Sequence, residues 1–361
     1  MGRFIPPPSV TAAGLRARNA LGRVHDRILP PAAFVIERLA GLVEVRMLGV
    51  VCELRVPDLL DAGPMTVDAL ARMAGADADA LGRVLRFLVS RGIFRHERDG
   101  RYANNSVSDV LRADHPDSMR DWALFIGASW HASIWSRADA SVRTGASATE
   151  AAFGTPFFDY VQHQNPAAGA QFDAAMASGS RLQAQLLLRS YDFAGAASVC
   201  DVGGGTGTVL AEVLRRHRNL RGTLFDRPSV IAKVTNELDG VTDRCQLVGG
   251  DFFTEVPAGH DLYMLLAIVH DWGDEHAGTI LGTVRAAMPA HGRVIVVDSV
   301  MPDHDRADLS KQFDVLMLVL TGSGRERTRA EFDRVFGAAG LRVARDITLP
   351  NLFHVFELAA A

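Results

Sequence analysis

Residues 198–208 read SVCDVGGGTGT and constrain the fold of this chain more than any other stretch. An apolar run that contains Asp201 is followed by a turn with four glycines and then by a helical pattern from Val209. That order predicts a strand, a tight turn and a helix. Glycine suits such a turn because a residue without Cβ tolerates positive φ and lets a ligand lie against the backbone.

The next predicted strand, residues 222–226, ends in Asp226, about twenty residues beyond the glycines. An acid in that place accepts hydrogen bonds from the hydroxyls of a ribose. A glycine turn without any ligand, the plain alternative, has no need of this acid. The pattern therefore favours a cofactor that contains a nucleoside.

Two nucleoside cofactors compete for this turn. A dinucleotide fingerprint requires Gly-x-Gly-x-x-Gly, so that pyrophosphate reaches the helix start, and its third glycine would fall at Thr208. S-adenosylmethionine has no pyrophosphate. The spacing of Gly203, Gly205 and Gly207, with Asp201 before them, suits its aminoacyl end. We therefore expect S-adenosylmethionine.

The whole chain has the composition of an ordinary globular protein, with 361 residues, 48% hydrophobic and 22% charged, which leads us to expect two domains. Its net charge of −4 disfavours nucleic acid as the main partner. Three cysteines without zinc or disulfide spacing indicate a reduced, cytoplasmic setting. Because no apolar run has the length of a signal peptide or a membrane span, we expect no membrane partner.

The N-terminal region is predicted to be helical after a loose arm that ends near Thr11 and contains three consecutive prolines. Residues 15–60 are apolar on more than one helical face, and each such face needs a partner. A buried core helix and a subunit interface both explain this pattern.

A winged-helix module is predicted over residues 65–105. Thr66 is placed to cap a first helix, residues 77–91 carry a second amphipathic pattern, and Asp99-Gly100 forms a hairpin turn. Such a module also allows a function of another class, a DNA-binding regulator. Its second helix would offer phosphates the basic side chains of Arg83, Arg86 and Arg91. The acids interspersed among them are more typical of a solvated face, so we expect no nucleic-acid partner.

Aromatic residues are frequent in the predicted helices of residues 117–191, where most are expected to form core. A minority could line an apolar pocket for a flat substrate, and Met176 has the adaptable side chain that such a pocket uses. After Asp226, strands continue to alternate with helices at residues 246–252, 261–267, 292–298 and 352–358. This alternation predicts a mostly parallel, doubly wound sheet with ligands at the carboxyl ends of its strands.

His270 follows one of these strands almost directly, on the ligand side of the sheet. Asp298 closes the next strand at the same edge, and Glu326 stands in the loop 324–328. An acid hydrogen-bonded to one ring nitrogen fixes the tautomer and leaves the other free to take a proton, so a neutral imidazole would suit a general base. A purely structural histidine is the alternative.

Three further features have two interpretations each. The ligand-rich segment 270–276 could suggest a metal, but Asp274 is predicted to cap a helix and the segment begins in a loop, so no metal is expected. Trp272 could stack on adenine or simply pack at the strand exit. Asp251 could accept a hydrogen bond from the adenine amino group or cap a helix.

Together these motifs resemble those of the plant-type, class I small-molecule O-methyltransferases that use S-adenosylmethionine, and of their bacterial relatives in natural-product pathways. The resemblance runs from about residue 30 to the end. It is carried by Asp201-Val-Gly-Gly-Gly-Thr-Gly207, Phe225-Asp-Arg-Pro228, Gly249-Gly-Asp251, His270-Asp-Trp272 and Gly324-Arg-Glu-Arg-Thr328. The chain departs from the family pattern at Gly179, Arg227 and Leu266.

The resemblance implies a Rossmann-like catalytic domain and an N-terminal winged-helix domain through which two chains form a homodimer. It implies His270 as general base, flanked by Asp298 and Glu326. Cofactor contacts would come from the 203–205 turn for the methionine part, Asp226 for the ribose, and Asp251 with Phe252 for the adenine. Met176 and Met317 would sandwich the acceptor ring.

We therefore expect a methyltransferase with three regions: a dimerisation domain at 1–115, a helical linker and substrate-pocket region at 116–190, and a cofactor-binding catalytic domain at 191–361. The expected reaction is O-methylation of a phenolic or other aromatic hydroxyl of a small secondary metabolite. N- or C-methylation, or other chemistry with the same cofactor, is the alternative on this scaffold.

Overall fold

The computed structural model describes residues 6–351 and 353–361, which form two compact units. The first unit comprises the described residues up to Val24, with Arg137–Gln162 and Ser180–Ala361. The second comprises His25–Ser136 and His163–Gly179.

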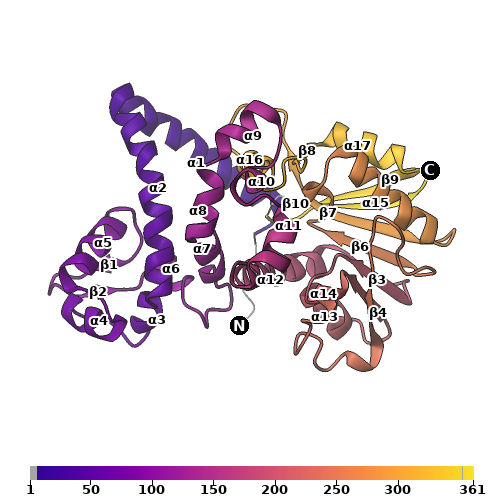
Figure 1. Cartoon of the computed structure of the whole chain (residues 1–361), viewed down its shortest axis with the longest axis horizontal. Coiled ribbons are helices and arrows are strands. Elements are labelled where there is room, and N and C mark those ends of the chain that lie inside the picture. Colours follow the sequence, from indigo (N-terminus) through magenta and orange to yellow (C-terminus); the bar gives the residue numbers. More distant parts are fainter. Residues whose placement is uncertain (1–5, 352) are drawn as a thin grey trace. The chain divides into compact units, whose positions relative to one another are not determined.

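The first unit is built on a mixed sheet that has eight strands within the described residues (Figure 1). Its strands are β3 (Ser198–Val202), β4 (Arg221–Asp226), β5 (Cys245–Gly249), β6 (Leu262–Leu266), β7 (Arg293–Met301), β8 (Arg327–Thr328), β9 (Leu341–Thr348) and β10 (Phe353–Ala360). The order is β5-β4-β3-β6-β7-β10-β9, and β8 pairs with the end of β7. From β3 the chain adds β4 and β5 on one side, and it then returns to add β6 and β7 on the other side. In open α/β sheets, ligands bind at the point where the strand order reverses in this way.

Helices cover both faces of this sheet. Figure 1 shows α13 (Thr208–Arg216) and α14 (Pro228–Ile231) on one face, with α15 (Asp274–Ala287) and α17 (Arg329–Ala338) on the other. Each face has its own apolar core, which contains Val199 and Leu224 on the first side, and Val294 and Phe332 on the second. Strands buried on both faces read as continuous apolar runs, which is why the sequence predicts the parallel strands well.

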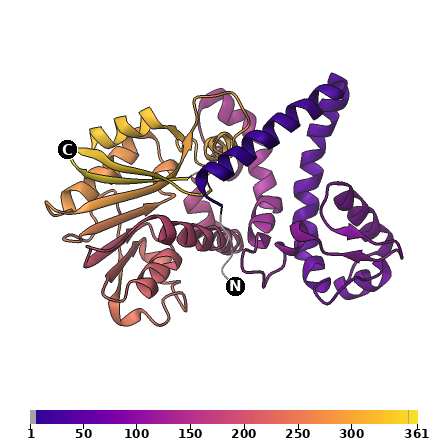
Figure 2. The same ribbon diagram turned by 180° about the vertical axis from the view of Figure 1, so that it is seen from behind.

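The C-terminal strands differ from the rest because β10 runs antiparallel to both β7 and β9. The sequence predicts β10 but misses β9, which lies at the sheet edge (Figure 2, yellow). β9 carries Arg342, Arg345 and Asp346 and is half exposed. Such an edge strand lacks the apolar run by which the parallel strands are recognised.

The second unit contains the predicted winged-helix module around α2 (Pro31–Glu53) (Figure 1). Thr66 caps α4 (Val67–Ala74), and Asp77 caps α5 (Ala78–Ser90) by accepting a 2.8 Å hydrogen bond from the Ala80 amide. The wing is the hairpin of β1 (Arg95–His96) and β2 (Tyr102–Ala103). Both predicted helices and the hairpin are therefore confirmed.

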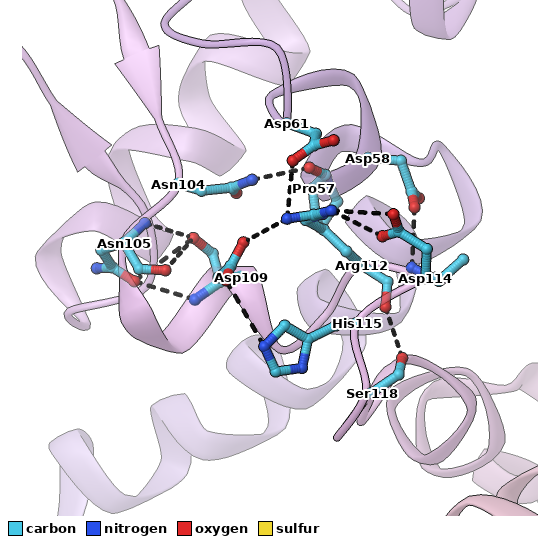
Figure 3. Close-up of polar contacts among 12 residues, drawn as sticks. Pro57, Asp58, Asp61, Asn104, Asn105, Asp109, Arg112, Asp114, His115 and Ser118 are labelled. Carbon is cyan, nitrogen blue, oxygen red and sulfur yellow. Dashed lines mark hydrogen bonds and ion pairs between the residues drawn. The ribbon is translucent and has the colours of Figure 1, made fainter. Parts of the chain in front are cut away.

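A cluster of ion pairs lies at the C-terminal end of this module (Figure 3). Arg112 lies 2.7 Å from Asp61 and 2.9 Å from each of Asp109 and Asp114. One arginine thus ties the turn after α3 (Val56–Leu59) to the end of α6 (Ser106–Asp109). Arg91 directly follows α5 and pairs with Glu44 at 2.7 Å, so its charge is already matched within the chain.

The remaining helices include one correction. Residues 8–11, expected in a loose arm, begin α1 (Pro8–Ile28), because proline is well suited to the first helical position, where no amide hydrogen bond is lost. Residues 1–5 of that predicted arm lie outside the described residues. The other helices are α7 (Arg120–Gly127), α8 (Ser129–Trp135), α9 (Ala138–Thr144), α10 (Ala148–Phe153), α11 (Phe157–Asp159), η1 (Tyr160–Gln164), α12 (Pro166–Ser190), η2 (Thr242–Arg244), η3 (Val269–Asp271) and α16 (Leu309–Thr321).

An apolar face of α2 remains uncovered in the single chain. Its exposed side chains are Val35, Ile36, Leu39, Leu42 and Val43, and Leu42 is 72% exposed. The interpretation of this face as buried core is therefore wrong for the single chain, and the subunit interface stays a prediction. None of the helices in the described part of the chain is long and apolar enough to cross a membrane.

Candidate functional site

The glycine turn lies at the carboxyl end of β3, at the point where the strand order reverses. Gly203, Gly205 and Gly207 adopt φ values of +73°, +59° and +85°, which side chains with a Cβ rarely adopt. The Gly205 amide donates a 2.8 Å hydrogen bond to Oδ2 of Asp226, at the end of β4. The predicted ribose acid therefore also holds the turn in place.

The turn has one packed side and one open side. A Cβ on Gly204 would lie 2.5 Å from Leu224 Cδ1 and 2.6 Å from Asp201 Cγ, whereas a Cβ on Gly205 would meet nothing within 4 Å. Asp201 is buried, and its Oδ2 has no hydrogen-bond partner among the residues that the structure describes. Burial, with the nearby Asp226 carboxylate, raises the pKa of Asp201 to about 7. A nucleoside cofactor with an aminoacyl end fits a turn that is open at Gly205 and backed by a carboxylate oxygen for which the described residues offer no partner.

Aromatic side chains gather beside this turn. A Cβ on Gly203 would lie 3.6 Å from Phe252, whose ring is in edge contact with Trp272 at 5.9 Å between centroids. Trp272 also lies nearly parallel to Phe158, with centroids 5.9 Å apart and planes at 23°. These rings form an apolar wall of the kind that accepts a flat base.

The structure gives Asp251 a local role besides any ligand contact. Its exposed carboxylate accepts a 3.0 Å hydrogen bond from the Phe253 amide, and its carbonyl accepts one of 2.9 Å from Thr254 Oγ1. Asp251 thus stabilises the turn that presents Phe252.

Three predicted residues come together at the ends of β6 and β7. His270 lies on the single-turn helix η3, and its Nδ1 is 2.9 Å from Glu326 Oε1 and 3.8 Å from Asp298 Oδ1. Asp298 is fully buried on β7, and Glu326 is 4% exposed next to β8. With Nδ1 donating to Glu326, Nε2 becomes the nitrogen that can accept a proton.

A third acid stands beside this histidine. Oδ1 of Asp271 lies 3.6 Å from His270 Nε2, at an ion-pair distance rather than in a hydrogen bond. Burial lowers the pKa of His270, but the carboxylates of Asp298, Asp271 and Glu326 outweigh it and raise that pKa to about 10. The sequence indicated only two of these three acids, and the role of His270 as a neutral base stays a prediction.

Further contacts missed by the sequence hold Glu326 in place. Ser299 donates a 2.5 Å hydrogen bond to Glu326 Oε2, and the Glu326 amide donates one of 2.9 Å to Asp314 on α16. Ser299 directly follows Asp298, and this adjacency was the only available signal.

The predicted helix cap is corrected by one residue. Gly273 occupies the cap position of α15, and Asp274 is its first residue. The Asp274 carboxylate instead pairs with Arg327 at 2.8 Å. In the described ranges, no group of three histidine, cysteine or acidic residues is arranged to hold a metal ion.

The two predicted acceptor residues belong to different units. Met176 is half-buried on α12 in the second unit, and Met317 is 8% exposed on α16 in the first. Their role as a pair stays a prediction.

A mostly parallel sheet with a glycine turn at its switch point and an acid at the end of the second strand defines a class I methyltransferase. Comparison with known proteins gives the family. The model of the O-methyltransferase domain matches residues 135–342, and that of the O-methyltransferase dimerisation domain matches residues 36–114.

A phenazine O-methyltransferase of Lysobacter antibioticus is 37% identical over 331 residues, covering 91% of this chain and 96% of the relative. A phenazine-1-carboxylate N-methyltransferase of Pseudomonas aeruginosa is 34% identical over 330 residues, covering 91% and 97%. The solved structure of a methyltransferase of calicheamicin biosynthesis, with S-adenosylhomocysteine bound, has a TM-score of 0.81 and 36% identity over 91% of this chain and 98% of that one. The chain belongs to the O-methyltransferase family, and its cofactor is S-adenosylmethionine.

Proposed function

We propose that this enzyme methylates an aromatic hydroxyl of a small secondary metabolite and that His270 is its general base. The observation that carries the proposal is the 2.9 Å contact between His270 Nδ1 and Glu326, which directs the proton-accepting Nε2 away from that acid. Relatives named for aromatic acceptors, the phenazine O-methyltransferase among them, support the substrate class.

The chain's own residues divide the work between holding the cofactor and moving a proton. The 203–207 turn with Asp201 would hold the aminoacyl part, Asp226 the ribose, and Asp251, Phe252 and Trp272 the adenine. When bound, S-adenosylmethionine supplies a methyl group on a sulfonium, whose sulfur is a good leaving group. Alignment and a proton sink are therefore what the protein must add.

His270 supplies this proton sink at Nε2. A phenolic hydroxyl has a pKa of about 10, and the acids around the ring raise the pKa of His270 into the same range. These acids favour transfer of the hydroxyl proton to Nε2, and Asp298 and Glu326 stabilise the imidazolium that forms. Met176 and Met317 would hold the acceptor ring between them.

We further infer that the active form is a homodimer joined through the N-terminal domain. The exposed apolar face of α2 and the match to a dimerisation-domain model support this arrangement. The division of the chain at residues 115 and 190 belongs to the same proposal. A cytoplasmic location, and the absence of nucleic-acid and membrane partners, stay predictions.

An acceptor screen tests the proposal. The enzyme is incubated with S-adenosylmethionine and a panel of phenols, naphthols and hydroxyphenazines, and products are detected by a mass increase of one methyl group. NMR of the product then locates the new methyl group. Methyl transfer to carbon or nitrogen alone, with no hydroxyl acceptor, would contradict the proposal.

N-methylation is the second candidate, and the similarity to the phenazine-1-carboxylate N-methyltransferase favours it. A neutral amine needs no base before it attacks. Including matched amines in the same panel, with wild type and His270→Ala side by side, separates the two reactions, because only hydroxyl methylation should depend strongly on His270.

A further inference from the structure

Arg327 is fully buried, and it is the largest fully buried side chain of the described residues. A buried guanidinium is stable only when its donors and its charge are matched. Nε donates to Asp274 Oδ1 at 2.9 Å, Nη1 to the Val269 carbonyl at 2.9 Å, and Nη2 to the Trp272 carbonyl at 2.7 Å. All three groups thus belong to the segment that surrounds His270.

The two carbonyls bracket the proposed base. Val269 immediately precedes His270, and Trp272 follows it by two residues. The helix η3 is a single 3-10 turn, and a helix of this length has little stability of its own. Its backbone position must therefore be set by neighbours.

The segment before η3 increases this need. Ala267 has a φ of +52°, in the left-handed region that an alanine adopts only at a cost. The Arg325 amide donates a 2.7 Å hydrogen bond to the His270 carbonyl, so the 325–327 segment binds the carbonyls of Val269, His270 and Trp272. Arg327 makes the side-chain hydrogen bonds of this segment, and Arg325 makes the backbone one.

We propose that Arg327 is a positioning residue, whose guanidinium fixes the backbone on both sides of His270 and so sets the distance between the imidazole and Glu326. Glu326 and Arg327 are consecutive. One short segment therefore provides both the carboxylate that contacts His270 Nδ1 and the guanidinium that binds the backbone on both sides of His270. That segment is itself in register with β7, where Val300 pairs with Arg327. Asp298, on the same strand, thereby joins one framework with Glu326 and His270.

Lysine could not replace this arginine. The planar guanidinium offers donors in fixed directions to two carbonyls and one carboxylate at once, whereas an ammonium is a point charge on a flexible stem. In Arg327→Lys, the charge next to Asp274 is kept but at least one of the two carbonyl contacts is lost.

Arg244 offers a matched control. It also donates to three backbone carbonyls, those of Leu214, Leu220 and His217, at 3.0, 3.0 and 3.3 Å. These carbonyls lie between the end of α13 and the start of β4, and Arg244 precedes β5, so all of them lie near the amino ends of strands, whereas His270 lies beyond the carboxyl end of β6. Arg244→Lys therefore reports the cost of weakening a carbonyl-binding arginine that has no link to the site.

The experiment compares Arg327→Lys, Arg244→Lys and wild type. Histidine labelled with ¹³C in the ring is titrated by NMR in the cofactor-free protein, with the His270 signal assigned by its absence in His270→Asn. Melting temperature, affinity for S-adenosylhomocysteine, kcat and KM are measured in parallel.

In Arg327→Lys, we expect the His270 titration midpoint to fall toward its ordinary value and kcat to fall about tenfold or more, a loss within the range that general-base catalysis contributes. KM and S-adenosylhomocysteine affinity should stay within about twofold. Arg244→Lys should change only the melting temperature. If Arg327→Lys behaves as Arg244→Lys does, the residue is structural and the proposal is overturned.

Should Arg327→Lys fail to fold, Asp274→Asn decides, because Asp274 is 46% exposed and its replacement removes only the charged partner of the guanidinium. We expect the titration midpoint and kcat to move in the same direction by smaller amounts. No movement in either would overturn the proposal. The inference rests on His270 being the base. If His270→Asn retains turnover, His270 is not the base, but the NMR titration still reports whether Arg327 positions the ring. Failure of the proposed function and failure of this inference are therefore distinguishable.

Discussion

The hydroxyl of Ser299 donates a 2.5 Å hydrogen bond to Oε2 of Glu326. The other oxygen of the same carboxylate contacts His270 Nδ1, so Glu326 is fixed at both ends. Ser299 lies on β7 and His270 follows β6. The carboxylate therefore connects these two adjacent strands on the ligand side of the sheet. The chemistry proposed for His270 depends on this connection.

Replacing His270 by Ala should lower turnover of a phenolic acceptor by ~10²–10⁴, the range that general-base catalysis contributes. Affinity for S-adenosylhomocysteine, measured by isothermal titration, should be nearly unchanged, because the proposed cofactor contacts lie on other residues. Retention of wild-type turnover by a correctly folded variant would show that the base is elsewhere.

The pH dependence follows from the three acids around the ring. Because the pKa of His270 is raised to about 10, the ring loses its proton only as the pH rises toward that value, and Nε2 can act as a base only then. Turnover should therefore rise with pH across the interval between about 6.5, the ordinary value, and 10. The ring titration of the cofactor-free protein should have its midpoint well above 6.5.

Glu326→Gln provides the test of this assignment. It removes one of the negative charges that favour the imidazolium, so both the NMR midpoint and the rising limb of the pH–rate profile should move to lower pH. The maximal kcat should fall, because an amide fixes the ring less firmly than a carboxylate does. A profile that stays in place would indicate that Glu326 does not face the ring in solution.

The parallel part of the sheet and the place of the site could be predicted because both depend on local patterns. Strands buried on two faces read as apolar runs, and a polar residue at or beyond the end of such a run is expected near the ligand edge. Asp226 ends β4 and His270 follows β6, whereas β7 continues past Asp298 to Met301. The edge strand β9 has no such pattern.

The contacts of Ser299 and Arg327 could not be predicted, for a different reason. They depend on the direction of a side chain beyond the end of a strand, which sequence spacing does not specify. The same limit explains why the sequence does not indicate that Asp271 stands beside the ring.

The cofactor turn can be tested by adding a single methyl group. Gly204→Ala would place Cβ 2.5 Å from Leu224 and 2.6 Å from Asp201, so the turn must shift, at a cost of about 1–3 kcal/mol for overpacking. We expect S-adenosylhomocysteine affinity to fall at least tenfold. Gly278→Ala is the control, because its Cβ meets nothing within 4 Å inside α15, and alanine there should stabilise the helix by roughly 0.5–1 kcal/mol. Equal affinities in the two variants would mean that the cofactor does not lie on this turn.

The homodimer proposal predicts that charge on the apolar face of α2 separates the subunits. Leu39 and Leu42 are 68% and 72% exposed in the single chain and lie on one helical face with Val35 and Val43. Leu39→Asp with Leu42→Asp should place two carboxylates in an apolar interface, which is strongly unfavourable. Light scattering after size exclusion should then report one chain of 39.0 kDa where the wild type has two.

Val142→Asp is the control. This position is 78% exposed on α9, and its replacement should leave the mass unchanged. If the double variant remains a dimer, the subunits associate through another surface, and the exposed face of α2 needs a different partner.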